Sequence, residues 1–185
     1  MPPPRKSNKT IIVAVIIIVA VLVVAAVAMT VMNASANVKS TSQEMVLKQS
    51  DFPSGWRTSG TTLELPDHPG VDWAYSVFNN SITRGATESF AEVSCQILTY
   101  NSVASAKADY SNMIQNESFQ PVTEVSGHFD QCHLKAISVS TVVMKEYVFQ
   151  KKNVCGVIVF SYVGGYQIDQ AWIDQMLDLQ ESRIV

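Results

Sequence analysis

The chain has 185 residues, of which 47% are hydrophobic, and its 13 basic and 16 acidic side chains give a formal charge of −3. All 16 acidic residues follow Val38, whereas three of the basic residues lie in the first ten positions. The portion after Val38 therefore carries ten basic and 16 acidic side chains, a formal charge of −6. Nucleic acids and anionic lipids bind basic surfaces, so we expect no nucleic-acid partner.

An uncharged apolar run, Ile11–Met32, predicts one transmembrane helix in contact with the lipid bilayer. Thr30 is its one polar position. At about 1.5 Å per residue its 22 residues make a helix of about 33 Å, which matches a hydrocarbon core of about 30 Å. The bilayer core offers no hydrogen-bond partner to unpaired backbone N–H and C=O groups, so a helix is expected despite the many β-branched residues. A buried core helix is the alternative, which the length of the run disfavours.

The charges beside this run predict its orientation. Three basic residues precede it, and Lys39 is the basic residue nearest on the far side. Positive residues stay in the cytoplasm, so we expect a cytoplasmic tail at 1–10 and an extracytosolic remainder. A signal peptide cleaved after "ASA", Ala34–Ala36, is the alternative. Signal peptides have apolar regions of about 7–15 residues, which favours an uncleaved signal-anchor in a single-pass membrane protein.

The remainder of the chain is long enough for one domain. Residues 33–43 are predicted to be a linker and 44–185 a domain with its own core. A short helix is expected near Glu44, with Ser42 as its cap.

The stretch "DFPSGW", Asp51–Trp56, predicts a tight turn. Pro53 fixes φ, Gly55 suits the turn, and the Asp51 carboxylate can accept from nearby backbone amides. We expect Trp56 to close the turn by packing on the core, rather than to stack on a ligand.

Alternating apolar residues predict two strands, at about 71–78 and 88–100. The second is expected to place Val93, Cys95 and Ile97 on one face and Gln96, Leu98 and Tyr100 on the other.

The period then changes to that of a helix over 101–115, for which Asn101 or Ser102 can be the N-cap. Two β-prone runs around "QKKN" predict a hairpin over 141–163, and a C-terminal helix follows. We therefore expect an α+β domain, an antiparallel sheet packed with helices in a sandwich-like arrangement. The apolar face of the C-terminal helix is expected to hold Ile168, Trp172, Met176, Leu179 and Ile184.

The chain from about residue 44 onward resembles a group of extracytosolic domains. The resemblance rests on the order of its parts: "L…SDFPSGW", a strand, a helix beginning near Ala106, "KKNVCGVIVFSY" and a final helix ending in "SRI". The group includes the PsbP-like fold and sensor-like domains of actinobacteria, among them that of the serine/threonine kinase PknH. The resemblance covers about 44–185 and implies a non-catalytic binding, sensing or assembly module. The kinase sensor domain has two disulfides, whereas this chain has three cysteines, and no binding residue is carried over. The clearest matching positions are Leu47, Asp51, Pro53, Gly55 and Trp56.

The three cysteines leave two interpretations open. Cys95 and Cys155 lie in predicted strands, and Cys132 lies in "HFDQCH". Outside the cytoplasm one pair normally oxidises, and three pairings are possible. Buried free thiols that act as small apolar groups are the alternative.

The segment "GHFDQCH" is the one local cluster of metal-ligating residue types. In an extended chain His128, Asp130 and Cys132 share one side and His133 takes the other. A structural zinc site needs four ligands, usually in paired knuckles, and the sequence has no second knuckle, so the cluster is a weak candidate. A surface loop is the expected alternative.

No catalytic signature occurs: the sequence lacks GxSxG, HExxH, CxxC and Walker motifs. We expect no enzyme activity and no cofactor. Asn79 and Asn116 begin N-x-Ser sequons on the extracytosolic side and are candidate glycosylation sites.

Three functional classes remain open. A tethered domain that binds a small molecule or an envelope protein predicts an apolar pocket between sheet and helix. A structural protein of the cell envelope or of a membrane complex predicts an exposed apolar patch instead. A metal- or thiol-dependent hydrolase requires His128, Asp130 and Cys132 to converge with a further ligand.

Overall fold

The computed structural model describes residues 37–59, 71–84, 87–115 and 122–185, which belong to one unit, Asn37–Val185. The predicted span, the cytoplasmic tail and the sequon at Asn116 lie outside these ranges. Within them, no helix combines the length and apolarity needed to cross a bilayer.

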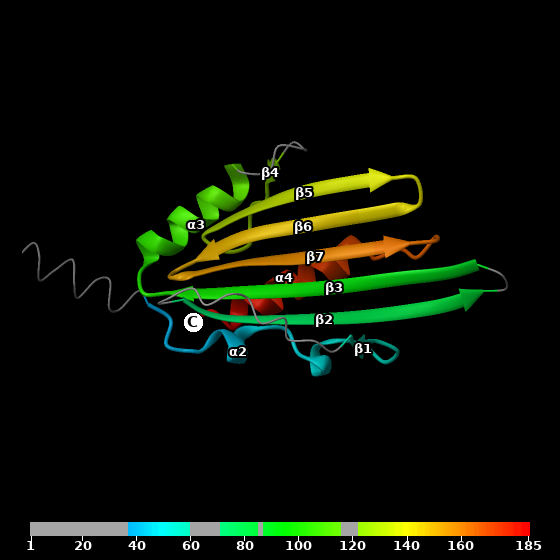
Figure 1. Cartoon of the computed structure of the whole chain (residues 1–185), viewed down its shortest axis with the longest axis horizontal. Coiled ribbons are helices and arrows are strands. Elements are labelled where there is room, and N and C mark those ends of the chain that lie inside the picture. Colours follow the sequence, from blue (N-terminus) through cyan, green and yellow to red (C-terminus); the bar gives the residue numbers. More distant parts are fainter. Residues whose placement is uncertain (1–36, 60–70, 85–86, 116–121) are drawn as a thin grey trace, which may run out of the picture. The chain divides into compact units, whose positions relative to one another are not determined.

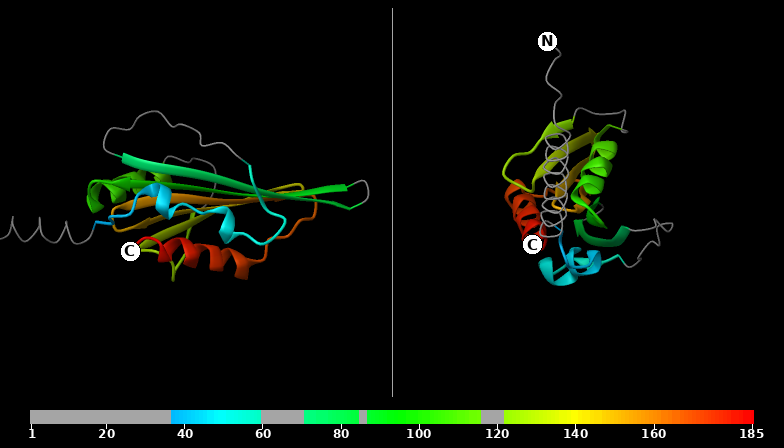
Figure 2. Two further views of the ribbon diagram at one scale, coloured as in Figure 1. Left: turned by 90° about the horizontal axis from the view of Figure 1, so that it is seen from below. Right: turned by 90° about the vertical axis from the view of Figure 1, so that its left-hand side faces the viewer.

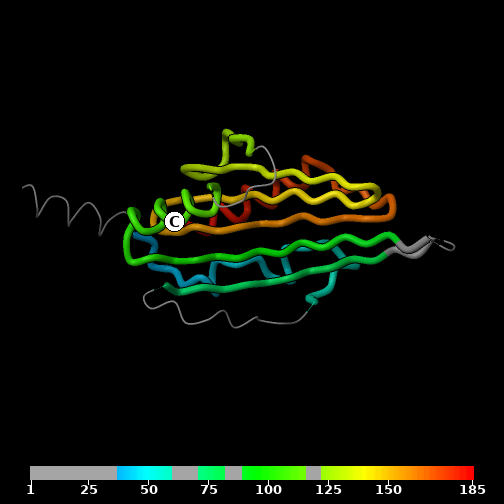
Figure 3. Tube along the Cα trace, turned by 45° about the horizontal axis from the view of Figure 1, so that its top comes forward, coloured from blue at the N-terminus to red at the C-terminus, as the bar shows by residue number. Residues whose placement is uncertain are grey.

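Seven strands of the described ranges form one antiparallel sheet in the order β1-β2-β3-β7-β6-β5-β4 (Figure 1). The β2–β3 hairpin and the β5–β6–β7 meander meet where β3 pairs with β7, as Figure 3 shows along the chain trace. Edge strands β1 and β4 have two and three residues, and short edges limit unwanted strand addition. The strands are β1 (Arg57–Thr58), β2 (Val71–Arg84), β3 (Thr87–Tyr100), β4 (Val122–Glu124), β5 (Gln131–Val139), β6 (Val142–Lys151) and β7 (Val154–Val163).

Helices pack on both faces of this sheet (Figure 2). Helices α2 (Ser42–Met45) and α4 (Gln170–Ser182) lie against one face, called here the α4 face. Helix α3 (Val103–Gln115) lies against the other, called the α3 face. A 3₁₀ turn, η1 (Gln49–Asp51), follows α2. The α+β prediction is confirmed.

The α4 face carries the main core, because alternate residues of every long strand point to it. In β3 these are Ala91, Val93, Cys95 and Ile97, all fully buried, so the predicted faces of this strand are confirmed. The other core side chains on this face include Phe78 of β2, Cys132 of β5, Tyr147 and Phe149 of β6, and Ile158 and Phe160 of β7.

Helix α4 lies on the core with the predicted residues, of which Ile168, Met176 and Ile184 are buried, and with further residues that the prediction omits. Its fully buried positions include Ile173 and Leu177, which the predicted apolar face omits, whereas Trp172 and Leu179 are half-buried. Positions three and four apart share a helix face, so the most deeply buried stripe within α4 runs through Ile173, Met176, Leu177 and Gln180. Gln180 was not expected there because its amide is polar.

The Gln180 amide is buried because both of its ends have partners. Its Nε2 donates to Met45 O at 3.0 Å, and its Oε1 accepts from Cys95 Sγ at 3.6 Å. The side chain therefore joins α4 to α2 and β3 through hydrogen bonds that replace those to water.

The "DFPSGW" turn closes the α4 face as predicted. Gly55 has φ 98°, and Trp56 packs in the core with Phe52, at 5.3 Å between ring centroids, and with Trp172, at 5.5 Å. Asp51 accepts from the N–H of Lys48 at 2.6 Å, which confirms the expected backbone bond. The stretch therefore seals one end of the core and does not expose an aromatic ligand platform.

The N-terminal part of the unit is held to the sheet by polar contacts. Val38 is already buried in the core, and its N–H donates to Asn153 Oδ1 at 2.6 Å. The predicted linker, 33–43, therefore includes packed residues. The cap of α2 is Thr41, which forms a capping box with Glu44, and not Ser42 as expected. Ser42 is the first helical residue, buried against Asp72.

Strand β5, Gln131–Val139, was not predicted, because its segment was interpreted as a loop. It pairs with β6 through nine residues, Cys132 opposite Phe149. Cys132 is 1% exposed in the core, and His133 points to the opposite face, where its Nδ1 is hydrogen-bonded to the hydroxyl of Tyr110. The prediction that adjacent Cys132 and His133 point apart is confirmed.

Candidate functional site

The α3 face is covered by α3 over one end of the sheet. Ala106 and Tyr110 of α3 pack there on Val148 and Cys155. Lys135 is buried beneath the C-terminal part of the helix, where its Nζ donates to Met113 O at 3.1 Å and to the Glu146 carboxylate at 3.3 Å.

Beyond α3 the same face carries a stretch of apolar side chains, called here the apolar strip. The end of the β5–β6 hairpin presents Val139 and Val142, which are 64% and 46% exposed. The other members are half-buried. By strand register the strip consists of Phe90 of β3, Ile137 and Val139 of β5, Val142 and Met144 of β6, and Val159 and Val163 of β7.

The strip departs from the pattern of a solvated sheet face. Antiparallel sheets with one wet face alternate apolar residues inward and polar residues outward. β7 instead carries valines toward the α3 face at Val157, Val159 and Val163, while Ile158 and Phe160 fill the core on the other side. A strand that is apolar on both faces is typical of a sheet covered on both faces, which makes the strip a candidate binding surface.

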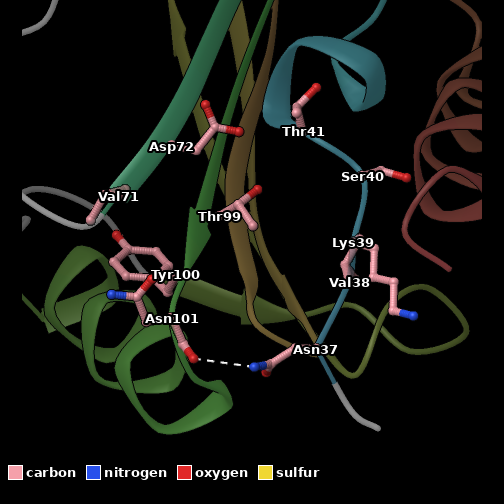
Figure 4. Close-up of a pocket in the computed structure, with 10 residues that line it drawn as sticks. All are labelled: Asn37, Val38, Lys39, Ser40, Thr41, Val71, Asp72, Thr99, Tyr100 and Asn101. Atoms are coloured by element: carbon pink, nitrogen blue, oxygen red, sulfur yellow. Dashed lines mark hydrogen bonds between the residues drawn. The ribbon is translucent and has the colours of Figure 1, made fainter. Parts of the chain in front are cut away.

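An open groove of about 700 Å³ lies between residues 37–41 and the ends of β2 and β3 (Figure 4). Asn37 Nδ2 donates to Asn101 O at 3.2 Å across it, and Lys39 extends away from the other lining residues. Asp72 accepts from Ser42 N–H at 2.6 Å. These polar groups tie the chain segment to the sheet and do not converge on the open space.

A second groove, of about 320 Å³, lies between 43–49 and β2. Leu47 and Phe78 line its floor with core atoms, and the Oγ of Ser76 is buried there without a hydrogen-bond partner among the described residues. The groove has one such polar atom and a partly apolar wall. Neither groove is the enclosed apolar pocket that a small-molecule binder predicts.

The predicted metal residues do not come together. Cys132 is buried in the core, and the Asp130 carboxylate accepts from Lys152 N–H at 2.8 Å, where it holds the β6–β7 turn. His128 instead lies beside α4. Its Nδ1 is 3.0 Å from Asp178 Oδ1, and a ligating atom of Glu181 completes a group of three within 4.8 Å of one another.

The Glu181 carboxylate is oriented by two further groups. Its Oε1 lies 2.9 Å from Lys151 Nζ, and the carboxylate accepts from the Phe129 N–H. Burial acts to raise the pKa of Glu181, but the Phe129 and Lys151 hydrogen bonds and the charges of Lys151 and His128 outweigh it and lower that pKa below its ordinary value. The carboxylate is therefore ionised at neutral pH and available to a cation.

Asp178 and Glu181 were missed in the sequence. They are spaced i, i+3 in the C-terminal helix, which places them on one helix face, and this spacing could have indicated a ligand pair. Their histidine comes from a segment 50 residues earlier, and single-sequence patterns do not predict that contact.

All three thiols are free and buried, as in the second interpretation of the cysteines. Cys95 and Cys132 point to the α4 face and Cys155 to the α3 face. Strands lie about 4.8 Å apart with about 3.3 Å between residues, so the register places every pair of cysteine Cα atoms about 10 Å apart or more. Disulfides need about 4.4–6.8 Å, so the fold permits none of the three pairings.

The thiols are expected to be almost inert in the folded chain. Burial raises the pKa of Cys95 and of Cys132 to about 12, and it raises the pKa of Cys155 too. The thiolate is the reactive form, so a disulfide reagent at pH 8 should label the native chain at least about 100-fold more slowly than an exposed cysteine. These folded-state pKa values exceed the ordinary 9.0. The contribution of the neutral buried thiols to the free energy of unfolding is therefore fully present below about pH 9 and is lost as the pH rises from about 9 to 12.

The measurement is a thiol count with and without denaturant, in each case without reductant. Three thiols per chain should react in denaturant. A count of one would show that a disulfide exists and would contradict the register argument.

The sequon residue Asn79 lies within β2, half-buried on the α3 face and paired with Glu92. Cys132 and His133 point to opposite faces, so they cannot form a nucleophile–base pair. Compared with known proteins, the chain matches no family model, no curated protein and no solved structure.

Proposed function

We propose that the chain is a non-catalytic binding domain, held outside the cytoplasm by one N-terminal membrane span, which associates with a second copy of itself through the apolar strip. The observation that supports this most is the strip itself, with valines on the outward side of β7 and at the β5–β6 hairpin end. The role agrees with the binding or assembly function that the resemblance to PsbP-like domains implies.

A protein partner fits the surface better than a small molecule does. The two grooves hold polar groups that are largely bonded within the fold, whereas the strip is broad and follows the sheet. Broad surfaces with few charges and with aromatic and aliphatic side chains are typical of the centre of protein interfaces.

The charge distribution favours a second copy at the strip. The portion after Val38 carries a formal charge of −6, so two copies repel each other over most surfaces. The strip has no charged member. Among the described residues, two carboxylates lie beside it: Glu146, which is paired with Lys135, and Glu92, which lies opposite Ser161. A two-fold interface requires one self-complementary patch, and face-to-face sheets pack about 10 Å apart.

The available area predicts a weak dimer. The four strands of the strip, about 4.8 Å apart and with about seven residues each beyond α3, offer about 450 Å² per copy or about 900 Å² in total. This is slightly below the total of about 1,000 Å² that a specific interface usually buries. Confinement to one membrane raises the effective concentration of a tethered domain, so association is expected in membranes rather than in dilute micelles.

Cysteine cross-linking in membranes tests the proposal, because the native thiols are buried. Ser161 lies on β7 at the centre of the strip, opposite Met144. In the full-length chain Ser161→Cys should form a disulfide-linked dimer on mild oxidation. Adding Val139→Asp should reduce the dimer about tenfold, because the new carboxylate loses its water in the interface. Val139 is 64% exposed, so that change leaves the fold intact.

Gln175→Cys is the matched control, since Gln175 is exposed on α4, on the opposite side of the sheet. Equal cross-linking at positions 161 and 175 would reject the strip as the interface. The same variant tests the location, because a membrane-impermeant maleimide should label Cys at position 175 in intact cells. Labelling that occurs only after lysis would contradict the extracytosolic placement.

A further inference from the structure

The loop between β4 and β5 holds His128 in a fixed position against α4. Gly127 has φ 93° and Phe129 has φ 58°, a conformation that residues other than glycine rarely adopt. The Phe129 ring stacks on Phe149 at 4.0 Å, and Asp130 N–H donates to Gln150 O at 3.1 Å. Unusual backbone of this kind persists where the surroundings enforce it, often at a ligand site.

His128 brings close to two carboxylates a ring nitrogen that makes no hydrogen bond with the described residues. Its side chain is 14% exposed, and the Nδ1 atom is buried without a hydrogen-bond partner among the described residues. Asp178 Oδ1 is 3.0 Å from that nitrogen, but the geometry is not that of a hydrogen bond. One potential ligating atom each from His128, Asp178 and Glu181 thus lies within 4.8 Å of the other two.

We propose that His128, Asp178 and Glu181 bind one divalent transition-metal ion of the Zn²⁺ class. Zinc takes imidazole nitrogen and carboxylate oxygen at about 2.0–2.2 Å, so its tetrahedral ligands lie about 3.4 Å apart. The three ligating atoms lie within 4.8 Å of one another, and the Asp178 side chain, which is 68% exposed, is free to adjust its carboxylate to a bound ion. The imidazole selects against Ca²⁺ and Mg²⁺, which prefer oxygen ligands alone.

The neighbours of the three ligands support this role. The Phe129 N–H and the Lys151 ammonium bind the Glu181 carboxylate and fix its orientation, as outer groups do around metal ligands. A carboxylate has two oxygens and about four lone-pair sites, so the Lys151 and Phe129 contacts leave lone pairs for the ion. A bound ion would join the β4–β5 loop to α4, with three protein ligands and a fourth position open to water.

The test is zinc binding to the purified full-length chain in detergent micelles, measured by competition with a chromogenic chelator. One Zn²⁺ per chain is expected, and Zn²⁺ should raise the melting temperature. Asp178→Asn should weaken binding at least about tenfold, and His128→Gln should weaken it further. Asp174→Asn, one turn earlier on the same helix, is the matched control and should leave the affinity unchanged.

Co²⁺ provides an independent spectroscopic measurement. A bound ion should give the visible absorption of a four- or five-coordinate nitrogen and oxygen site, without a thiolate charge-transfer band. The proposal is overturned if Asp178→Asn binds Zn²⁺ as tightly as the natural chain, or if the Co²⁺ spectrum shows thiolate coordination. Both results can be read without any assay of self-association, so they do not depend on the proposed dimer.

Discussion

Gly156→Ala is expected to destabilise the domain by about 3 kcal/mol, at the upper end of the range for overpacked cores. Gly156 lies in β7 opposite Phe149 and Ile97, in the middle of the sheet. An added Cβ would be 2.7 Å from the backbone oxygen of Gln96 and would overlap the Phe149 ring. The strand cannot move away without breaking its hydrogen bonds to both neighbours. Urea unfolding followed by tryptophan fluorescence measures the change.

Two variants show whether the overlap is the cause. Phe149→Leu in the Gly156→Ala background should recover part of the lost stability. The smaller leucine removes the overlap with the Phe149 ring, but the close contact with the Gln96 backbone oxygen remains. Ser161→Ala on the same strand adds no volume and should change stability by less than about 0.5 kcal/mol. If Gly156→Ala unfolds at the same urea concentration as the natural chain, the close packing of Phe149 over β7 is wrong.

Asp51→Ala is expected to cost about 3 kcal/mol, the lower end for a buried ion pair that loses one partner. The Asp51 side chain is 8% exposed and lies 2.6 Å from Arg183 Nη2. Its other oxygen accepts from Lys48 N–H, and Arg183 Nη1 donates to Val46 O at 3.1 Å. The pair therefore fixes the end of α4 to the segment after α2, and its loss leaves the Arg183 charge, the Nη2 group and the Lys48 N–H without the Asp51 carboxylate.

Asp51→Asn separates the two contributions. The amide oxygen can still accept from Lys48 N–H, but it carries no charge for Arg183, so about half of the loss is expected. The double variant with Arg183→Met should cost less than the sum of the two single changes, since residues in one pair are not additive. Strict additivity would show that the Asp51–Arg183 contact does not contribute to folding.

Local pattern predicted those parts of the fold in which neighbouring residues decide the structure. The alternation of Val93, Cys95 and Ile97 was enough to assign both faces of β3, and the β6–β7 hairpin followed from two β-prone runs around a polar turn. Strand β5 was missed although Cys132, Leu134 and Ala136 alternate there with the polar residues His133 and Lys135, which is the period of a strand. Both are accommodated by α3, through Met113 O and Tyr110, in contacts that local sequence does not encode.

The candidate metal group shows the same limit. Sequence proximity grouped His128 with Asp130 and Cys132. Because side chains alternate along β5, Cys132 points into the core. The Asp130 carboxylate accepts a hydrogen bond from the backbone N–H of Lys152. The two carboxylates near His128 come from α4, whose position on the sheet depends in part on Ile173 and Leu177, which the predicted apolar face omitted.

The separation of the three thiols on different strands and faces has a practical consequence for biogenesis. With no covalent cross-link to form, the fold is independent of the redox potential around it. The domain should reach the same structure in a reducing or an oxidising compartment, without a disulfide-forming oxidoreductase. Its integrity therefore depends on buried apolar surface and on a few polar contacts such as the Asp51–Arg183 pair.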